Sequence, residues 1–142
     1  MSKSLPIIIQ SIVYRTRNKE FEVLLLKRTE QRGGFWNVVN GTFELDESII
    51  ESRKRELLEE TGIQEVLYWS DEINRFSFPY KDYVIVVLVY SAEVSENQKI
   101  IINDEHTEYK WVNFEEAASM VKFNDDKNGL RMCQERLMIK ES

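Results

Sequence analysis

The sequence has 142 residues, with a hydrophobic content of 42% and a charged content of 31%, both ordinary for a globular protein. Its formal net charge of −6 argues against a general nucleic-acid or anionic-membrane binder, because such proteins need a basic surface. A single cysteine excludes an intrachain disulfide, and no apolar run approaches the roughly 20 residues of a membrane span. We therefore expect one soluble domain over residues 1–142, in the cytoplasm and without a signal peptide.

The chain is predicted to begin with two strands. Ile7–Tyr14 is rich in β-branched residues, and Arg15–Glu20 is a turn that leads into Phe21–Leu26. The uninterrupted apolar run Val23–Leu26 indicates burial on both faces of a sheet. Arg28 closes this strand, where a surface charge is the ordinary expectation.

The stretch Gly41–Ile63 is predicted to form a tight loop followed by one helix. Ser48 and Glu51 have the spacing of a capping box at the helix start, and Gly62 is a natural helix stop. Taken alone, Asn40 followed by glycine is a hairpin-turn signal.

The same helix displays three carboxylates on one face. Glu56 and Glu60 are one turn apart, and Glu59 lies three residues from Glu56. Ile50 and Leu57, seven residues apart, are expected on an apolar seam that docks on the core. Like charges at this spacing destabilise an isolated helix, and bound cations would reverse that cost. A solvated acidic face is the simpler alternative for three glutamates alone.

The second half is predicted to alternate short strands with helices. Strands are expected at residues 66–69, 73–78, 83–90 and 108–112, with Pro79 ending the second and the third the most buried. One helix follows from Phe114, and Asn124–Asp126 can cap a last helix. The apolar stripe of that last helix consists of Leu130, Cys133, Leu137 and Met138.

One spacing in the centre of the chain resembles the signature of the Nudix hydrolases at every specified position. It runs from Gly41 over five residues to Glu47, then over seven residues to Arg55-Glu56-Leu57-x-Glu59-Glu60-x-Gly62-Ile63. The resemblance implies an α/β (α+β) fold, the Nudix α/β/α sandwich with a central mixed β-sheet. The chain departs from the pattern at Asn40 and Asp46, where glycine is common, although both residue types tolerate left-handed or capping geometry.

The resemblance also implies a site for Mg²⁺, with Mn²⁺ as a substitute. Its expected ligands are the Gly41 carbonyl and the side chains of Glu56, Glu59, Glu60 and Glu105. Hard divalent cations take oxygen ligands, which these groups supply. Among the expected catalytic residues, Arg55 would orient a glutamate and balance the acidic cluster. Glu47 is expected to anchor the loop.

Residues outside this signature are expected to complete the site. Glu105 is the candidate general base, with an ordinary loop charge as the alternative. Arg28 and Trp36 are candidate substrate contacts, the first through forked donors suited to phosphate, the second by stacking on a base or pterin ring. His106 is expected to stabilise its loop.

The function expected from the resemblance is Mg²⁺-dependent hydrolysis of a phosphoanhydride. The favoured substrate is a deoxynucleoside triphosphate or dihydroneopterin triphosphate, cleaved to the monophosphate and pyrophosphate. The alternatives are a dinucleoside polyphosphate such as diadenosine tetraphosphate, an oxidised nucleotide, or a nucleotide-sensing domain without turnover. We expect a monomer or homodimer that binds a small molecule and neither nucleic-acid polymers nor membranes.

Overall fold

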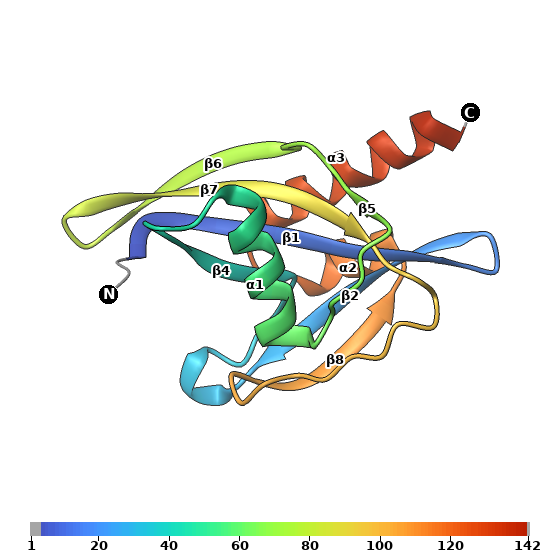
Figure 1. Ribbon diagram of the computed structural model, residues 1–142, viewed down its shortest axis with the longest axis horizontal. Helices are drawn as coiled ribbons and strands as arrows, with labels where there is room; N and C mark the ends of the chain where they lie inside the picture. The colour runs from blue at the N-terminus through green and yellow to red at the C-terminus, as the bar shows by residue number, and fades with distance from the viewer. Residues whose placement is uncertain (1–3, 142) are drawn as a thin grey trace.

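The computed structural model describes residues 4–141 and contains a mixed eight-stranded sheet with three α-helices (Figure 1). The elements in chain order are β1 (Ser4–Arg17), β2 (Glu20–Arg28), the 3₁₀ turn η1 (Glu30–Arg32), β3 (Trp36–Asn37), β4 (Val39–Glu44), α1 (Ile49–Thr61), β5 (Tyr68–Trp69), β6 (Asn74–Tyr80), β7 (Tyr83–Glu93), β8 (His106–Val112), α2 (Phe114–Met120) and α3 (Asn124–Glu141). Among these helices, none is both long and apolar enough to span a membrane.

Strand β1 lies at the centre of the sheet. It pairs in parallel with β7, while its first half pairs antiparallel with β4 and its end pairs antiparallel with β2. Strand β2 continues outward to β8 and β3, and β5 and β6 both pair with β7. One parallel pair in an otherwise antiparallel sheet makes it mixed, as predicted.

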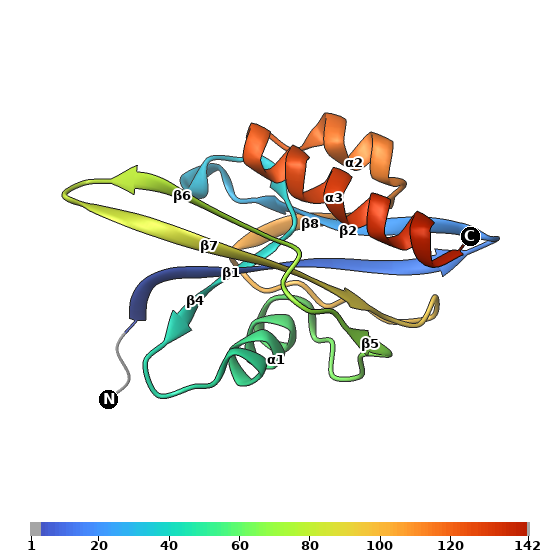
Figure 2. The ribbon, with the colours of Figure 1, turned by 90° about the horizontal axis from the view of Figure 1, so that it is seen from above.

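The helices cover both faces of the sheet. Figure 2 shows α1 on one face and α2 with α3 on the other. Alternate residues of β2 enter two separate cores, because successive side chains of a strand point to opposite faces. Leu25 packs with Leu130 and Cys133 in one core, and Leu24 packs with Leu57 in the other. The α/β/α sandwich and the double-sided burial of β2 are therefore confirmed.

Helix α1 has the predicted ends, but a different buried face. The Ser48 hydroxyl accepts from the Glu51 N–H at 3.2 Å, the Glu51 carboxylate accepts from the Ser48 N–H at 2.9 Å, and Gly62 ends the helix with φ +74°. The prediction for Ile50 was wrong, since that side chain is exposed and its neighbour Ile49 packs on the sheet instead.

The buried face of α1 is therefore rotated toward its acids. It consists of Ser52, Arg53, Glu56, Leu57, Glu60 and Thr61. Arg53 holds this face to the sheet by donating to the carbonyls of Ser70 and Ser91, each at 3.0 Å. Two of the three predicted acids consequently point into the protein rather than toward bulk water.

The hairpin turn predicted at Asn40-Gly41 is absent from the structure. Both residues lie inside β4, where they pair with Gln10 and Ile9 of β1. Pairing with the long central strand overrides the local turn signal. Gly41 is therefore held in the sheet, directly beside α1.

Three smaller predictions were also wrong. Pro79 does not end its strand, since β6 continues to Tyr80. Among the described strands, β6 pairs with β7 alone and is therefore an edge strand. A proline is tolerated at an edge because its missing N–H can face the side that has no partner strand. Strand β7 starts exposed, at Tyr83 and Val84, because this hairpin end has no further neighbour. Met138 is exposed rather than part of the α3 core stripe.

Candidate active site

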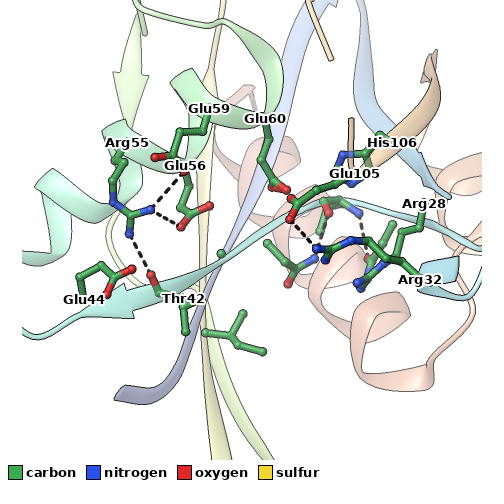
Figure 3. A pocket seen from close by; sticks show the side chains of 15 residues that line it. Arg28, Arg32, Thr42, Glu44, Arg55, Glu56, Glu59, Glu60, Glu105 and His106 are labelled. Atoms are coloured by element: carbon green, nitrogen blue, oxygen red, sulfur yellow. Dashed lines mark hydrogen bonds and ion pairs between the residues drawn. The ribbon is translucent and has the colours of Figure 1, made fainter. Parts of the chain in front are cut away.

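A cavity of about 370 Å³ opens between α1, β4 and the loop before β8. Its lining includes the four predicted acids Glu56, Glu59, Glu60 and Glu105. Gly41, Arg28 and Arg55 line it too, so the structure gathers every predicted site residue except Trp36 (Figure 3).

Arg55 connects the acidic residues of α1 to the preceding loop. Its Nε donates to both oxygens of Glu47, at 3.0 and 2.8 Å, and its Nη1 donates to Glu56 Oε1 at 2.7 Å. Its Nη2 reaches the Thr42 carbonyl of β4 at 2.9 Å. Hydrogen bonding from Arg55 lowers the pKa of Glu47, which also accepts from Ser52. With these contacts Glu47 anchors the loop before α1, and Arg55 orients the Glu56 carboxylate.

Glu56 packs directly on the backbone of Gly41. A Cβ atom added to that glycine would lie 1.7 Å from the carboxyl carbon of Glu56, so only glycine leaves room for the carboxylate. Glu56 is 6% exposed. Burial raises its pKa to about 7, Arg55 opposes this shift, and the charges of Glu59 and Glu105 add to it.

Glu60 is a buried acid of the site. It is 5% exposed, and within residues 4–141 its Oε2 is buried without a hydrogen-bond partner. Burial raises its pKa to about 8, and the charges of Glu56 and Glu105 and a side-chain hydrogen bond with Glu105 raise it further. Figure 3 shows the carboxylates of Glu60 and Glu105 pointing toward each other. Buried like charges of this kind are stabilised by a cation.

The donors around the cavity fit a divalent cation that prefers oxygen. Within residues 4–141, no three Asp, Glu, His or Cys side chains are already gathered as a ligand set. Two features nevertheless fit the implied ion: the unpartnered oxygen of Glu60, and the close approach of Glu56 to the backbone of Gly41. Both features place oxygen atoms where they can be ligands of a hard cation. At Glu60 the cation would take the place of the missing hydrogen bond.

The raised pKa values predict how stability depends on pH when metal is removed. In EDTA, the free energy of unfolding should fall between about pH 5 and pH 8, because folded Glu56 and Glu60 keep protons that the unfolded chain releases near its ordinary value of 4.5. The stability that Glu56 and Glu60 contribute through these bound protons is fully present below pH 4.5. It is lost as the pH rises through their folded-state pKa values of about 7 and 8. Urea titrations of the wild type and of a Glu56→Gln/Glu60→Gln double variant measure this. Equal pH slopes for the two proteins would contradict the prediction.

The loop before β8 places Glu105 opposite α1. Its carboxylate pairs with Arg32 of η1 at 2.9 Å, and its carbonyl accepts from the Thr29 N–H at 3.2 Å. The next residue, His106, contacts Asn103 Oδ1 through Nδ1 at 3.2 Å, and burial lowers its pKa. His106 therefore has the contacts of a loop-stabilising residue, although it also lines the cavity.

A second cavity, of about 380 Å³, adjoins the first. Both are lined by Ile8, Arg28, Asn37 and Asn40, so the two cavities are direct neighbours. The second cavity has aromatic walls and also reaches buried polar groups. The aromatic residues are Phe35, Phe76, Phe78 and Phe123, and the buried polar ones are Gln10 and Asp126.

Trp36 lies outside both cavities. Its ring packs against the core beneath α2 and α3, and Lys110 lies 5.6 Å over it. Its neighbour Phe35, which directly precedes β3, does line the second cavity, with Arg28 5.2 Å over its ring.

Sequence reasoning missed most of the second cavity. Phe76 and Phe78 carried a usable signal, since their alternation on a strand places both on one face. Asp126 belongs to the segment that the sequence predicts as the cap of the last helix. Gln10 is one polar residue in an apolar strand, and only the tertiary structure reveals its role.

Comparison with known proteins identifies the family. The model of the NUDIX domain matches residues 8–132. The nucleoside triphosphatase NudI of Salmonella paratyphi B is 35% identical in an alignment of 107 residues that covers 67% of this chain and 75% of that protein. The octanoyltransferase of Myxococcus xanthus is 32% identical in an alignment of 128 residues that covers 87% of this chain and 34% of that longer protein.

Solved structures share the fold. The Ap4A hydrolase of C. elegans, in a binary complex, superimposes with a TM-score of 0.84 at 20% identity, covering 93% of this chain and 97% of that one. The dihydroneopterin triphosphate pyrophosphohydrolase of E. coli gives a TM-score of 0.76 at 21% identity, with coverages of 92% and 95%. At this identity the likeness concerns the fold alone. Together with the matched domain and the acidic cavity on α1, it shows that the chain belongs to the MutT-like Nudix hydrolases, enzymes that act on phosphoanhydride bonds.

Proposed function

We propose that this chain is a Mg²⁺-dependent pyrophosphohydrolase that cleaves a nucleoside or pterin triphosphate to the monophosphate and pyrophosphate. The observation that carries the proposal is that two cavities adjoin each other, one lined by carboxylates and the other by aromatic rings. A triphosphate with a planar ring has this same division into a charged part and an aromatic part. The 35% identity to a nucleoside triphosphatase is consistent with it.

Arg28 is placed to bind the substrate between its two parts. It lines both cavities and lies over the Phe35 ring, so its guanidinium can bind a phosphate next to the sugar. Arg32 supplies a second guanidinium at the mouth of the acidic cavity, where it pairs with Glu105. Lys122 lies 5.5 Å from the rings of both Phe35 and Phe123, which adds positive charge beside the aromatic cavity.

The residues that would hold Mg²⁺ are Glu56, Glu59 and Glu60, with the Gly41 carbonyl. When bound, the ion would neutralise phosphate charge that the carboxylates alone would repel. Arg55 keeps Glu56 in place through its 2.7 Å hydrogen bond and balances part of the cluster charge. Glu59 is more exposed than the other two, so it would face the substrate side of the cavity.

Glu105 is proposed to take a proton from the attacking water. The water oxygen forms a new bond to phosphorus, the anhydride P–O bond breaks, and its electron pair leaves with pyrophosphate. Arg32 orients the Glu105 carboxylate before the reaction. Because the Glu105 and Glu60 carboxylates lie side by side in the lining of the cavity, a substrate phosphate bound beside them would lie within reach of both groups.

Gly41→Ala should lower kcat by roughly a hundredfold while leaving the fold intact. The new Cβ would overlap the Glu56 carboxyl group, whose flexible side chain must then move away from the cavity. Steady-state kinetics and thermal unfolding measure the two effects. Gly129→Ala is the matched control, because its Cβ would meet only ordinary contacts of 3.6 Å or more. Unchanged kcat in Gly41→Ala would contradict the proposed role of Glu56.

The proposed function is tested by resolving the products from a panel of substrates with Mg²⁺. The panel contains deoxynucleoside triphosphates, dihydroneopterin triphosphate, diadenosine tetraphosphate and nucleotide sugars. Pyrophosphate released from a triphosphate supports the proposal, whereas ATP released from the dinucleotide would replace it with the alternative. We further propose that the chain acts as one domain in the cytoplasm, as a monomer or homodimer.

A further inference from the structure

Arg53 is a buried cation of α1 that the proposed reaction does not use. It is 4% exposed, and its Nη1 and Nη2 donate to the carbonyls of Ser70 and Ser91, each at 3.0 Å. Within residues 4–141 it forms no ion pair with a carboxylate, and its Nε is buried without a hydrogen-bond partner. Burial lowers its pKa to about 10, a shift that the charges of Tyr90 and Asp71 oppose, so the guanidinium stays protonated near neutral pH.

Aromatic rings and backbone enclose this guanidinium on the side of the sheet. Its central carbon lies 4.1 Å from the centre of the Tyr90 ring and 5.0 Å from that of the Trp69 ring. The two acceptor segments are joined to each other, because the Ser70 N–H donates to the Ser91 carbonyl at 3.0 Å and the Ser91 N–H donates to Ser70 Oγ at 2.8 Å. Arg53 therefore docks α1 on a closed hydrogen-bonded unit of the sheet.

Stability alone does not account for a buried arginine at this place. A buried charged group with an unpaired N–H is often no more stabilising than a well-packed apolar side chain of similar size. An apolar side chain lacks directional contacts, however, whereas the fork of Arg53 meets two carbonyl oxygens in one orientation. The two hydrogen bonds therefore fix how far α1 is rotated about its own axis.

That rotation decides where the acids of α1 lie. Glu56 and Glu60 follow Arg53 by three and seven residues, so all three side chains share one buried stripe of the helix. The surface of a helix lies roughly 5 to 6 Å from its axis, so a rotation of about 20° would move side-chain atoms there by about 2 Å. A displacement of about 1 Å can already cost a catalytic site roughly a hundredfold in rate.

From this geometry we infer that Arg53 is a positioning residue of the metal site: its two hydrogen bonds fix the rotation of α1 that brings the Glu56 and Glu60 carboxylates into the acidic cavity. Arg53 acts through position and not through its charge. Among the described residues, Arg55 and Arg28 lower the pKa of these glutamates, and Arg53 is not one of the groups that shift it. The inference rests on the proposed function and adds a residue to its metal site.

The test measures the binding of Mn²⁺ to the metal-free protein by electron paramagnetic resonance, without nucleotide. Arg53→Met keeps the length of the side chain but removes both hydrogen bonds. The Kd for Mn²⁺ should rise by about 10- to 100-fold, the effect typical of groups that orient metal ligands. With a triphosphate that the wild type cleaves, at saturating Mg²⁺, kcat should fall by about tenfold or more while KM changes little.

Arg15→Met is the matched control. Arg15 is also a buried arginine, 7% exposed, with its guanidinium 4.2 Å from the centre of the Trp111 ring. It donates to Glu22 and to the Glu96 carbonyl, neither of which belongs to α1. Arg15→Met should therefore lower the unfolding temperature and leave Mn²⁺ binding and kcat unchanged. Equal weakening of Mn²⁺ binding in Arg15→Met and Arg53→Met would overturn the inference, because general destabilisation would then explain both.

The remaining outcomes are separable. Wild-type affinity for Mn²⁺ in a folded Arg53→Met protein would overturn the inference and leave the proposed function standing. If no triphosphate is cleaved, the proposed function fails and Mn²⁺ binding alone decides the inference; if the wild type binds no Mn²⁺, both fail. If Arg53→Met does not fold, Arg53→Lys replaces it. Lysine keeps the charge but not the planar fork, so Mn²⁺ should bind about tenfold more weakly, and wild-type affinity would overturn the inference.

Discussion

Glu60→Gln should reduce kcat by roughly a thousandfold, with the fold preserved. The amide keeps the size of the side chain but removes the charge that would help to hold the metal ion. In the described part of the chain the buried Oε2 has no hydrogen-bond partner, so the substitution breaks no hydrogen bond of that atom there. Glu60 is also destabilised by its carboxylate neighbours, and its replacement should leave the unfolding temperature unchanged or raised.

The control for this prediction is Glu65→Gln. Glu65 lies five residues further along the chain at an exposed position, and its substitution makes the same change in net charge. Steady-state kinetics at saturating Mg²⁺ and circular dichroism compare the two variants with the wild type. Turnover within a few fold of the wild type in a folded Glu60→Gln protein would refute the role of Glu60.

Glu105→Gln is the second substitution with a large expected effect. A general base contributes roughly 10² to 10⁴ in rate, so kcat should fall by that order while KM changes little. The Arg32 contact at 2.9 Å can persist with the amide oxygen, which keeps the loop in place.

Glu108→Gln provides the matched control for Glu105→Gln. Glu108 lies three residues away on β8, where it makes a 3.7 Å ion pair with Lys27 at the surface. The kcat of the Glu108→Gln variant should match that of the wild type, because exposed ion pairs of this kind contribute little to stability. An effect of Glu105→Gln on KM alone would make Glu105 a substrate ligand and not the base.

The acidic half of the site was predictable because its determinants are local. The capping box of Ser48 and Glu51 and the stop at Gly62 fix the ends of α1, and helical spacing fixes which acids share a face. The direction of that face was not predictable from periodicity, because Arg53 is buried against backbone carbonyls of the sheet and so turns Glu56 and Glu60 inward.

The aromatic half was not predictable because it is assembled from distant strands and a helix. Gln10 meets Asp126 across 116 residues of sequence, and their contact depends on how α3 packs against β1. Gly41 is a second example. Its local sequence favours a hairpin turn, but pairing with β1 holds it inside strand β4 instead. In both cases tertiary contacts decide the role of a residue whose local sequence favours a different interpretation.

The most direct measurement is a crystal structure of this protein with Mg²⁺ and a dGTP analogue that carries a non-hydrolysable α,β-bridge. The account predicts metal ions coordinated by Glu56 and Glu60, phosphates beside Arg28, and the planar ring in the aromatic cavity. A nucleotide bound elsewhere, or bound here without an ion at these two glutamates, would contradict it.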